Sequence, residues 1–274
     1  MEVSTFELIF KPQSPAAPSG VAAVERVIQG YFLAISNLEE QEYRYRLDFV
    51  APPPAAGSPN AAFRTPAGNT VVFVDAGGGD NQQGVLNGGP TATVFRPSTG
   101  FVRVPAQGTA LVAVLPSAFG PLPGEPTPLV VPNFEVRGFV RISLPAVRKP
   151  GGPFFQTVPQ SKGPVRVLLT PQHRATFLDA GGAITDQIQT SLPVAGGAAI
   201  AALPPEPGGF IVFDSLVTPE LFAPQIEGLS PAERGAMLTG LLAGVSEAGE
   251  LADLNKELAP EIGLAIERRT KKDA

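Results

Sequence analysis

Proline and glycine recur along the whole chain, and they limit what it can fold into more than any other feature of the sequence. The 274 residues include 31 prolines and 30 glycines. Proline lacks a backbone donor and fixes φ, so it suits strand ends, sheet edges and turns rather than long helices or long central strands. The segments between them, such as TVVFVDA and GTALVAVLP, are too apolar and β-branched for a solvated coil. The sequence therefore predicts many short strands.

About a dozen segments have the alternating or apolar pattern of a strand and are bounded by turn residues. The predicted strands are 3–10, 24–36, 43–50, 70–75, 91–95, 101–104, 109–115, 134–144, 165–170, 174–179, 188–192, 198–203 and 210–213. This pattern predicts a mainly β protein, with an antiparallel β-sandwich or jelly-roll-like core at residues 1–216. So many strands leave two alternatives open, a single sandwich with insertions or two packed units.

The segment YRYRLDFV, residues 43–50, alternates almost without error. Tyrosine, leucine and phenylalanine fall on one face, and Arg44, Arg46 and Asp48 fall on the other. The preceding segment GYFLAISN also alternates, and the short polar link 38–41 predicts a hairpin between the two. The charged face is then expected to be the solvated side of an antiparallel sheet.

A second reading of this charged face is a ligand site. Arg137 and Arg141 project from the same side of FEVRGFVRIS and could join the charged face of residues 44–48. The ligand-binding candidates are Arg44, Arg46, Asp48, Arg137 and Arg141. They suit a small molecule or a carbohydrate, although the chain has no Trp and only three Tyr to stack on sugar rings.

The chain changes character near residue 217, and residues 217–274 are predicted to be a helical C-terminal segment. Ser230-Pro231-Ala232-Glu233 forms a capping box with proline at the first helical position. Leucines and a valine then follow at helical spacing, which predicts an apolar stripe that packs on the β core or on another subunit. The candidates for oligomer or partner contacts are Leu238, Leu242, Val245, Leu251, Leu254 and Leu258.

Catalytic and metal-binding patterns are weak in this sequence. The single histidine, His173, would have to serve any Ser-His-Asp mechanism, and no serine lies in a nucleophile elbow. One histidine and no cysteine leave no ordinary zinc site. The Gly-rich stretch DAGGGDN lacks the spacing of a phosphate-binding loop or a calcium loop. We therefore expect no cofactor and no metal, and a hydrolase using His173 is the third hypothesis.

Charge and hydropathy favour contacts with proteins. Charged residues are only 16% of the chain and the net charge is −5, which gives no general attraction to nucleic acid or to anionic lipid. No uncharged stretch reads as a membrane helix, because the best one, residues 188–205, is broken by Pro193, Gly196 and Gly197, and the start lacks the features of a signal peptide. The leading hypothesis is therefore a non-enzymatic cytoplasmic binding or assembly module that makes protein contacts as a homo-oligomer.

Three segments occur in an order that resembles a known family. They are AISNLEEQEYRYRLDF, then GFVRVPAQGTALVAVLP with its Val104-Pro105-Ala106 corner, then FEVRGFVRISLP. This order is similar to that of bacterial β-sandwich proteins related to the sensory rhodopsin transducer family. The resemblance covers about residues 30–145 and implies a small soluble oligomer that docks on a protein partner. It carries no functional residue over to this chain.

Overall fold

The structure, a computed structural model, describes residues 1–12, 25–77, 79, 81–89, 92–118, 133–149 and 156–210. The chain divides into two compact units. The first contains Met1–Pro145 and Gln160–Glu206, and the second contains Ala146–Pro159 and Pro207–Ala274. The predicted helical segment 217–274 and its six candidate contact residues lie outside the described residues.

The described residues form strands and one short 3-10 helix, η1 (Ala61–Phe63). The strands are β1 (Glu2–Pro12), β2 (Arg26–Asn37), β3 (Tyr43–Val50), β4 (Thr70–Ala76), β5 (Gln82–Gly84), β6 (Leu86–Asn87), β7 (Val94–Pro97), β8 (Val102–Val104), β9 (Thr109–Pro116), β10 (Phe134–Ser143), β11 (Val147–Arg148), β12 (Gln156–Val158), β13 (Val165–Leu178), β14 (Ile184–Ser191), β15 (Ile200–Leu203) and β16 (Gly209–Phe210). The expectation of a mainly β, antiparallel protein is confirmed.

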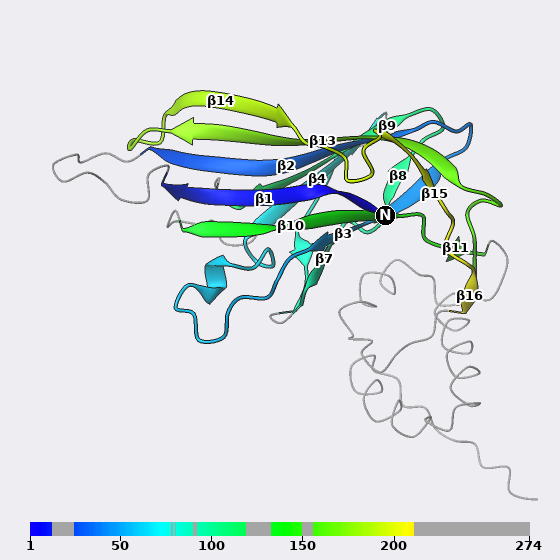
Figure 1. Ribbon diagram of the computed structural model, residues 1–274, viewed down its shortest axis with the longest axis horizontal. Coiled ribbons are helices and arrows are strands. Elements are labelled where there is room, and N and C mark those ends of the chain that lie inside the picture. The colour runs from blue at the N-terminus through cyan, green and yellow to red at the C-terminus, as the bar shows by residue number, and fades with distance from the viewer. Residues whose placement is uncertain are drawn as a thin grey trace, which may run out of the picture. The chain divides into compact units, whose positions relative to one another are not determined.

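The first unit is built on a 13-stranded sheet whose named strands all pair antiparallel. The strand order runs β5-β4-β9-β2-β1-β10-β3-β7-β6, with β13 along the other edge of β2 and with β14 and β15 beyond β13 (Figure 1). The sheet curls into a near-barrel, in which β4 and β8 also come close to each other.

The curl begins where β2 changes its neighbour. Residues 26–29 of β2 pair with β1, whereas residues 31–36 pair with β9. Gly30 lies at this fork, where a Cβ atom would be 2.3 Å from Leu115 Cδ2 and 2.9 Å from the Val114 carbonyl oxygen. The lack of a side chain therefore lets β9 approach β2 as β1 departs from it. Two parts of the sheet, called here the β1–β10–β3 layer and the β9–β4 layer, then face each other.

Aromatic side chains fill the space between these two layers. Phe6 of β1, Tyr31 of β2 and Phe49 of β3 meet edge to face, with ring centroids 5.5 to 6.4 Å apart. All three are fully buried, and valines from β4, β9 and β10, with Ile142 of β10, extend the same core. Burial raises the pKa of the Tyr31 phenol, and its hydroxyl shares a hydrogen bond of 2.9 Å with Ser4. The apolar residues of the alternating pattern thus face the core, and the polar residues between them face outward.

The predicted hairpin between residues 24–36 and 43–50 is wrong. β2 pairs with β1, β9 and β13, whereas β3 pairs with β10, β7 and β8. The link between them crosses from one layer to the other. Asn37 holds this crossover, because its buried side chain donates to the carbonyl oxygens of Gln41 (2.6 Å) and Pro105 (2.9 Å).

The prediction that prolines exclude a long central strand also fails, at β13. This strand has 14 residues, with Pro171 at its middle, and pairs with β2 from Val167 to Leu178. Its other edge changes neighbour from β15 to β14 at this point. The Pro171 carbonyl accepts the Leu192 N–H at 2.9 Å, so Pro171 faces the edge of β13 on which β14 and β15 lie. The N–H and C=O groups of one strand residue point to the same edge, so the N–H that proline lacks would also have pointed there. Proline is tolerated there because the ladder is interrupted.

The second unit is described only at residues 146–149, 156–159 and 207–210. There β11, β12 and β16 form a three-stranded antiparallel sheet. The Thr157 hydroxyl donates to the Gly209 carbonyl oxygen at 3.1 Å.

Candidate functional site

The charged face of β3 is largely engaged in ion pairs rather than freely solvated. Asp48 is only 8% exposed, because Arg141 of β10 and Arg96 of β7 flank it on the two neighbouring strands. Its carboxylate accepts from Arg96 Nε at 2.7 Å and from Arg141 at 3.3 Å. The expectation of a simply solvated face therefore fails at Asp48, where strands on both sides supply arginines.

The other two candidates on β3 have different partners. Arg46 forms a bidentate ion pair with Glu206. Arg44 is exposed at its side chain, and its backbone exchanges hydrogen bonds with the side-chain amide of Gln160, at 2.9 and 2.7 Å. These contacts do not bring the guanidinium group of Arg44 or of Arg46 to the Asp48 carboxylate.

Arg137 belongs to another cluster on the same outer face. It lies opposite Glu7 in the β1–β10 ladder and pairs with both Glu7 and Glu135. The hydrogen bond to Glu7 is the main reason that the pKa of Arg137 is raised. Burial tends to raise the pKa of Glu135, but Lys11, Arg137 and Arg64 outweigh it and hold that pKa below its usual range.

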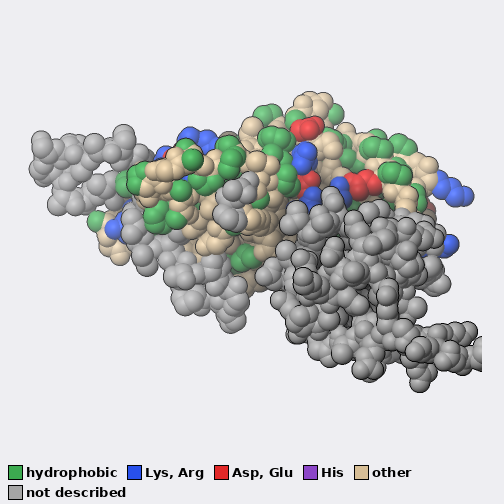
Figure 2. Space-filling model, turned by 90° about the horizontal axis from the view of Figure 1, so that it is seen from below, with side chains coloured by type: hydrophobic (Ala, Val, Ile, Leu, Met, Phe, Trp, Pro, Cys, Tyr) green, Lys and Arg blue, Asp and Glu red, His purple; other side chains and the backbone are tan. Residues whose placement is uncertain are grey.

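The structure thus brings two of the five ligand-binding candidates together, Asp48 and Arg141, and distributes the other three among separate contacts. Figure 2 shows acidic and basic side chains side by side on the visible face, with hydrophobic side chains over much of the rest. The sequence analysis missed Glu7, Arg96, Glu135 and Glu206, which neutralise this face. The alternation of Glu7 along β1 was the available signal for one of them.

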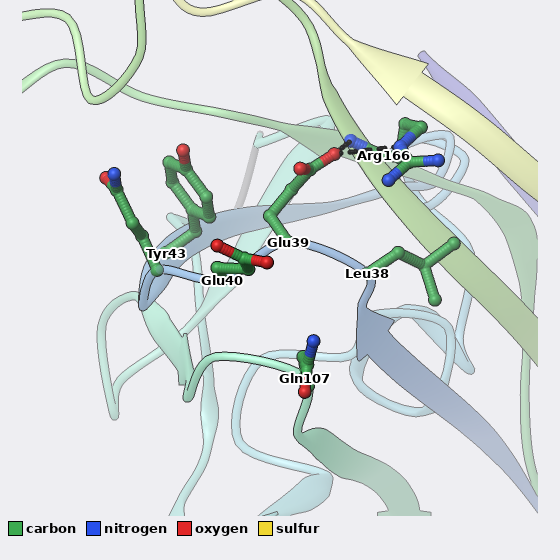
Figure 3. A pocket seen from close by; sticks show the side chains of 7 residues that line it. Leu38, Glu39, Glu40, Tyr43, Gln107 and Arg166 are labelled. Atoms are coloured by element: carbon green, nitrogen blue, oxygen red, sulfur yellow. Dashed lines mark hydrogen bonds and ion pairs between the residues drawn. The ribbon is translucent and has the colours of Figure 1, made fainter.

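A hollow of about 390 Å³ opens beside the crossover between β2 and β3 (Figure 3). Its walls come from the crossover itself, from the turn before β9 and from the start of β13. The residues that line it are Leu38, Glu39, Glu40, Gln41, Tyr43, Gln107 and Arg166. We call it the crossover hollow. Its side chains are mainly amides and carboxylates around the edge of a tyrosine ring.

Two contacts fix the shape of the crossover hollow. Glu39 accepts from both the backbone N–H (3.1 Å) and Nε (3.0 Å) of Arg166, and these hydrogen bonds lower the pKa of the Glu39 carboxyl. Gln107 has a positive φ of 53°, unusual for a residue with a side chain, and its N–H donates to the Glu39 carbonyl oxygen at 3.0 Å. Arg166 and Gln107, the two partners of Glu39, thus hold the crossover in place.

Tyr45 is a buried phenol next to this region. Its pKa is raised by burial first, and then by the nearby Tyr43 and Glu39. No described group forms a hydrogen bond with the Tyr45 hydroxyl, although the side chain is fully buried. A water molecule or a ligand hydroxyl is the kind of partner that such a group favours.

A second hollow, of about 350 Å³, lies between the three prolines of residues 52–54 and the Glu135 cluster. Arg64 and Arg137 point their charge into the same region, but both form ion pairs with Glu135. This hollow is therefore a mixed surface in which the arginines already have partners.

His173 lies on β13, opposite Tyr31 of β2, and is half buried. Its Nε2 accepts the backbone N–H of Glu7 at 3.1 Å, and its ring meets the Tyr31 ring at 6.3 Å. Burial lowers the pKa of His173, against the opposing effect of the Glu7 carboxylate. The sequence analysis left His173 between the predicted strands 165–170 and 174–179, whereas β13 continues through it.

The outer edge of β14 is the most exposed part of the described sheet. All eight residues of β14 are exposed, and β13 is its only neighbour among the described strands (Figure 1). Ile184 and Ile188 are 63% and 49% exposed. The sequence prediction began this strand at residue 188, because residues 184–187 (ITDQ) have no apolar alternation.

Among the described residues, no group of three or more histidines and carboxylates is placed to hold a metal ion. Nor does the described part of the chain contain a helix with the length and apolarity needed to cross a bilayer.

Comparison with known proteins found no family model, no curated protein and no solved structure that matches this chain. The class of protein is therefore described from the fold alone. The first unit is an antiparallel, mainly β near-barrel with a charge-paired outer face, and among its described strands β14 has one unpaired edge.

Proposed function

We propose that this protein is a non-enzymatic assembly module that makes protein–protein contacts through the open edge of its sheet. The observation that carries the proposal is β14, an eight-residue strand with β13 on one side and no described strand on the other. Such an edge offers backbone donors and acceptors to another chain.

The charge-paired outer face supports the same function. The arginines and carboxylates that a charged ligand would need are already in contact with one another. Exposed isoleucines lie instead on β14 and β15. Apolar side chains at a sheet edge favour contact with another protein over contact with an ion.

Sedimentation of the full chain across a wide concentration range tests this proposal. An assembly module is expected to show a mass that rises with concentration above that of one 28.4 kDa chain. The same measurement is repeated in mild denaturant. Comparison of the two series separates specific association from aggregation. A strictly monomeric chain that also captures no protein partner would contradict the proposal.

A second function, the binding of a small neutral molecule such as a carbohydrate, is favoured by the crossover hollow. Its amides and carboxylates can bond hydroxyl groups, and Tyr43 offers a ring edge. Ligand-observed NMR with a panel of neutral sugars tests it, using Gln41→Ala, which keeps the backbone contact to Asn37. Loss of binding in Gln41→Ala but not in Gln82→Ala, on exposed β5, supports this site.

The fold classification, the location and the type of partner belong to the same proposal. The two facing layers favour a β-sandwich or jelly-roll classification for the near-barrel, and a cytoplasmic location stays a prediction, as does docking on a partner of the transducer type. The hydrolase hypothesis requires His173 to act as a base, although its Nε2 accepts the Glu7 N–H. Any ester-hydrolysing turnover that survives in His173→Ala excludes that mechanism.

A further inference from the structure

We infer that a second copy of this chain adds to the sheet through β14, in an antiparallel ladder whose twofold axis passes between the Ile188 residues of the two copies. The inference rests on the proposed assembly function and specifies its partner and geometry. The contact joins two eight-residue strands edge to edge, and it uses side chains and backbone groups that the described fold leaves at the surface.

The β13–β14 ladder fixes which backbone groups of β14 face outward. Leu192 donates to the Pro171 carbonyl, so Asp186, Ile188 and Thr190 direct their N–H and C=O groups toward β13, up to the register shift between Phe177 and Leu178. Gln187, Gln189 and Ser191 therefore direct theirs away from it. The Gln187 N–H is donated to the Asp186 side chain at 2.7 Å, a local bond that substitutes for an adjacent strand.

The sequence of β14 is nearly symmetric about Ile188. In ITDQIQTSL, residues 184–192, a twofold axis through Ile188 places Gln187 opposite Gln189 of the second copy. It likewise places Thr185 opposite Ser191. Amide meets amide, hydroxyl meets hydroxyl and Ile188 meets its own copy, which is the requirement of an isologous contact.

Charge favours the same register. Asp186 is the one charged residue of β14, and the axis places it opposite Thr190 rather than opposite its own copy. β14 also has no lysine and no proline, the residues that commonly protect an edge strand from pairing. An edge with a single charge, a symmetric sequence and no lysine or proline fits a copy of itself better than it fits a charged partner.

The two Ile188 side chains would meet at the centre of this contact. Because Ile188 bonds its backbone to β13, it occupies a non-hydrogen-bonded position toward the second copy, where Cα atoms lie roughly 4.5 Å apart. That spacing is within the range of about 4.4 to 6.8 Å that a disulfide bond spans. The chain has no native cysteine, so a single introduced cysteine reports on this contact alone.

The test is disulfide cross-linking of the full-length Ile188→Cys protein under mild oxidation. The matched control is Ile184→Cys, whose side chain is more exposed, 63% against 49%. In the proposed register the two copies of residue 184 are separated by eight positions, roughly 27 Å along the strands. We expect Ile188→Cys to cross-link at least about tenfold faster than Ile184→Cys, because only its thiols are held together.

A second pair of variants tests the contact without a thiol. Ile188→Lys places two like charges opposite each other at the axis and should abolish association, whereas Ile200→Lys on exposed β15 should leave it intact. Circular dichroism checks that both variants fold.

The outcomes separate this inference from the proposed function. Faster cross-linking at residue 184, or equal rates at both positions, overturns the register and the inference. If the unmodified chain associates but Ile188→Lys associates equally well, the edge contact is wrong and the assembly function stands. If the unmodified chain neither associates nor captures a protein partner, both proposals fail.

Discussion

At the scale of single residues, one glycine shows how closely backbone and side chains are packed in the first unit. Gly138 of β10 lies where β3 passes, and a Cβ atom there would be 1.9 Å from the Val50 carbonyl oxygen and 2.8 Å from Phe6 Cε1. Backbone cannot move aside as the end of a flexible side chain can. Glycine at this position is therefore a condition for the β10–β3 pairing.

Gly138→Ala is expected to destabilise the protein by about 1 to 3 kcal/mol or more, since the added methyl group overlaps the β3 backbone. Urea unfolding followed by circular dichroism measures the loss. Gly163→Ala is the matched control, because nothing lies within 4 Å of a Cβ atom at that position. Equal stabilities for the two variants would show that β3 does not pass so close to Gly138.

His173 should make the stability depend on pH. Burial lowers its pKa in the folded chain, so below the unfolded value of roughly 6.5 the unfolded chain binds more protons. An imidazolium also cannot accept the Glu7 N–H. The free energy of unfolding should fall as pH decreases from about 7 to about 5.5.

Denaturant unfolding at several pH values measures this decline, and the single imidazole gives an unambiguous NMR titration. His173→Gln is the comparison, since its amide does not titrate. The difference in unfolding free energy between the two proteins should shrink toward the acidic end of the range. A constant difference would mean that His173 titrates alike in the folded and unfolded chains.

At the scale of elements, the sequence predicted strands better than it predicted their neighbours. The alternation of residues 43–50 gives β3 its correct bounds and its buried face. The same pattern cannot distinguish a hairpin from a link that changes layer, because both place two alternating segments around a short polar turn. The signal that decides is Asn37, whose side chain bonds carbonyl groups far along the chain.

The second wrong prediction at this scale concerns a strand that contains proline. The prediction divided residues 165–179 into two strands at Pro171, whereas β13 runs through it. Proline interrupts a strand only where the ladder needs its N–H, and that depends on neighbours that are distant in sequence. For the same reason, the partners Glu206 and Arg96 of the β3 charges could not be inferred locally.

Asn37→Ala should destabilise the protein by about 1 to 3 kcal/mol, because it leaves the carbonyl groups of the crossover without their donor. Thermal unfolding measures the change, with Asn87→Ala, at the exposed position of β6, as the control. Hydrogen exchange adds a local readout, since the Glu39 N–H now donates to the Asn37 side chain at 3.1 Å. If exchange at Glu39 is unchanged, Asn37 does not hold the crossover.

At the scale of the whole molecule, few charges and many internal ion pairs give a prediction about salt. The proposed contact between copies combines backbone hydrogen bonds with isoleucine, so screening should change its affinity little. We expect the dissociation constant to vary by less than about threefold between about 0.05 M and 0.5 M NaCl. Sedimentation at each concentration measures it, and a steep weakening with salt would instead indicate a charge-driven contact.

The long ladder between β2 and β13 sets the order of events during synthesis. β2 is among the first strands to leave the ribosome, but its most extensive neighbour comprises residues 165–178. Loop closure over such a separation is slow, because chain entropy is lost before any pairing compensates for it. A nascent chain of this protein therefore carries an incomplete β2 for most of its translation, and its folding is completed by one of the last described strands to be made.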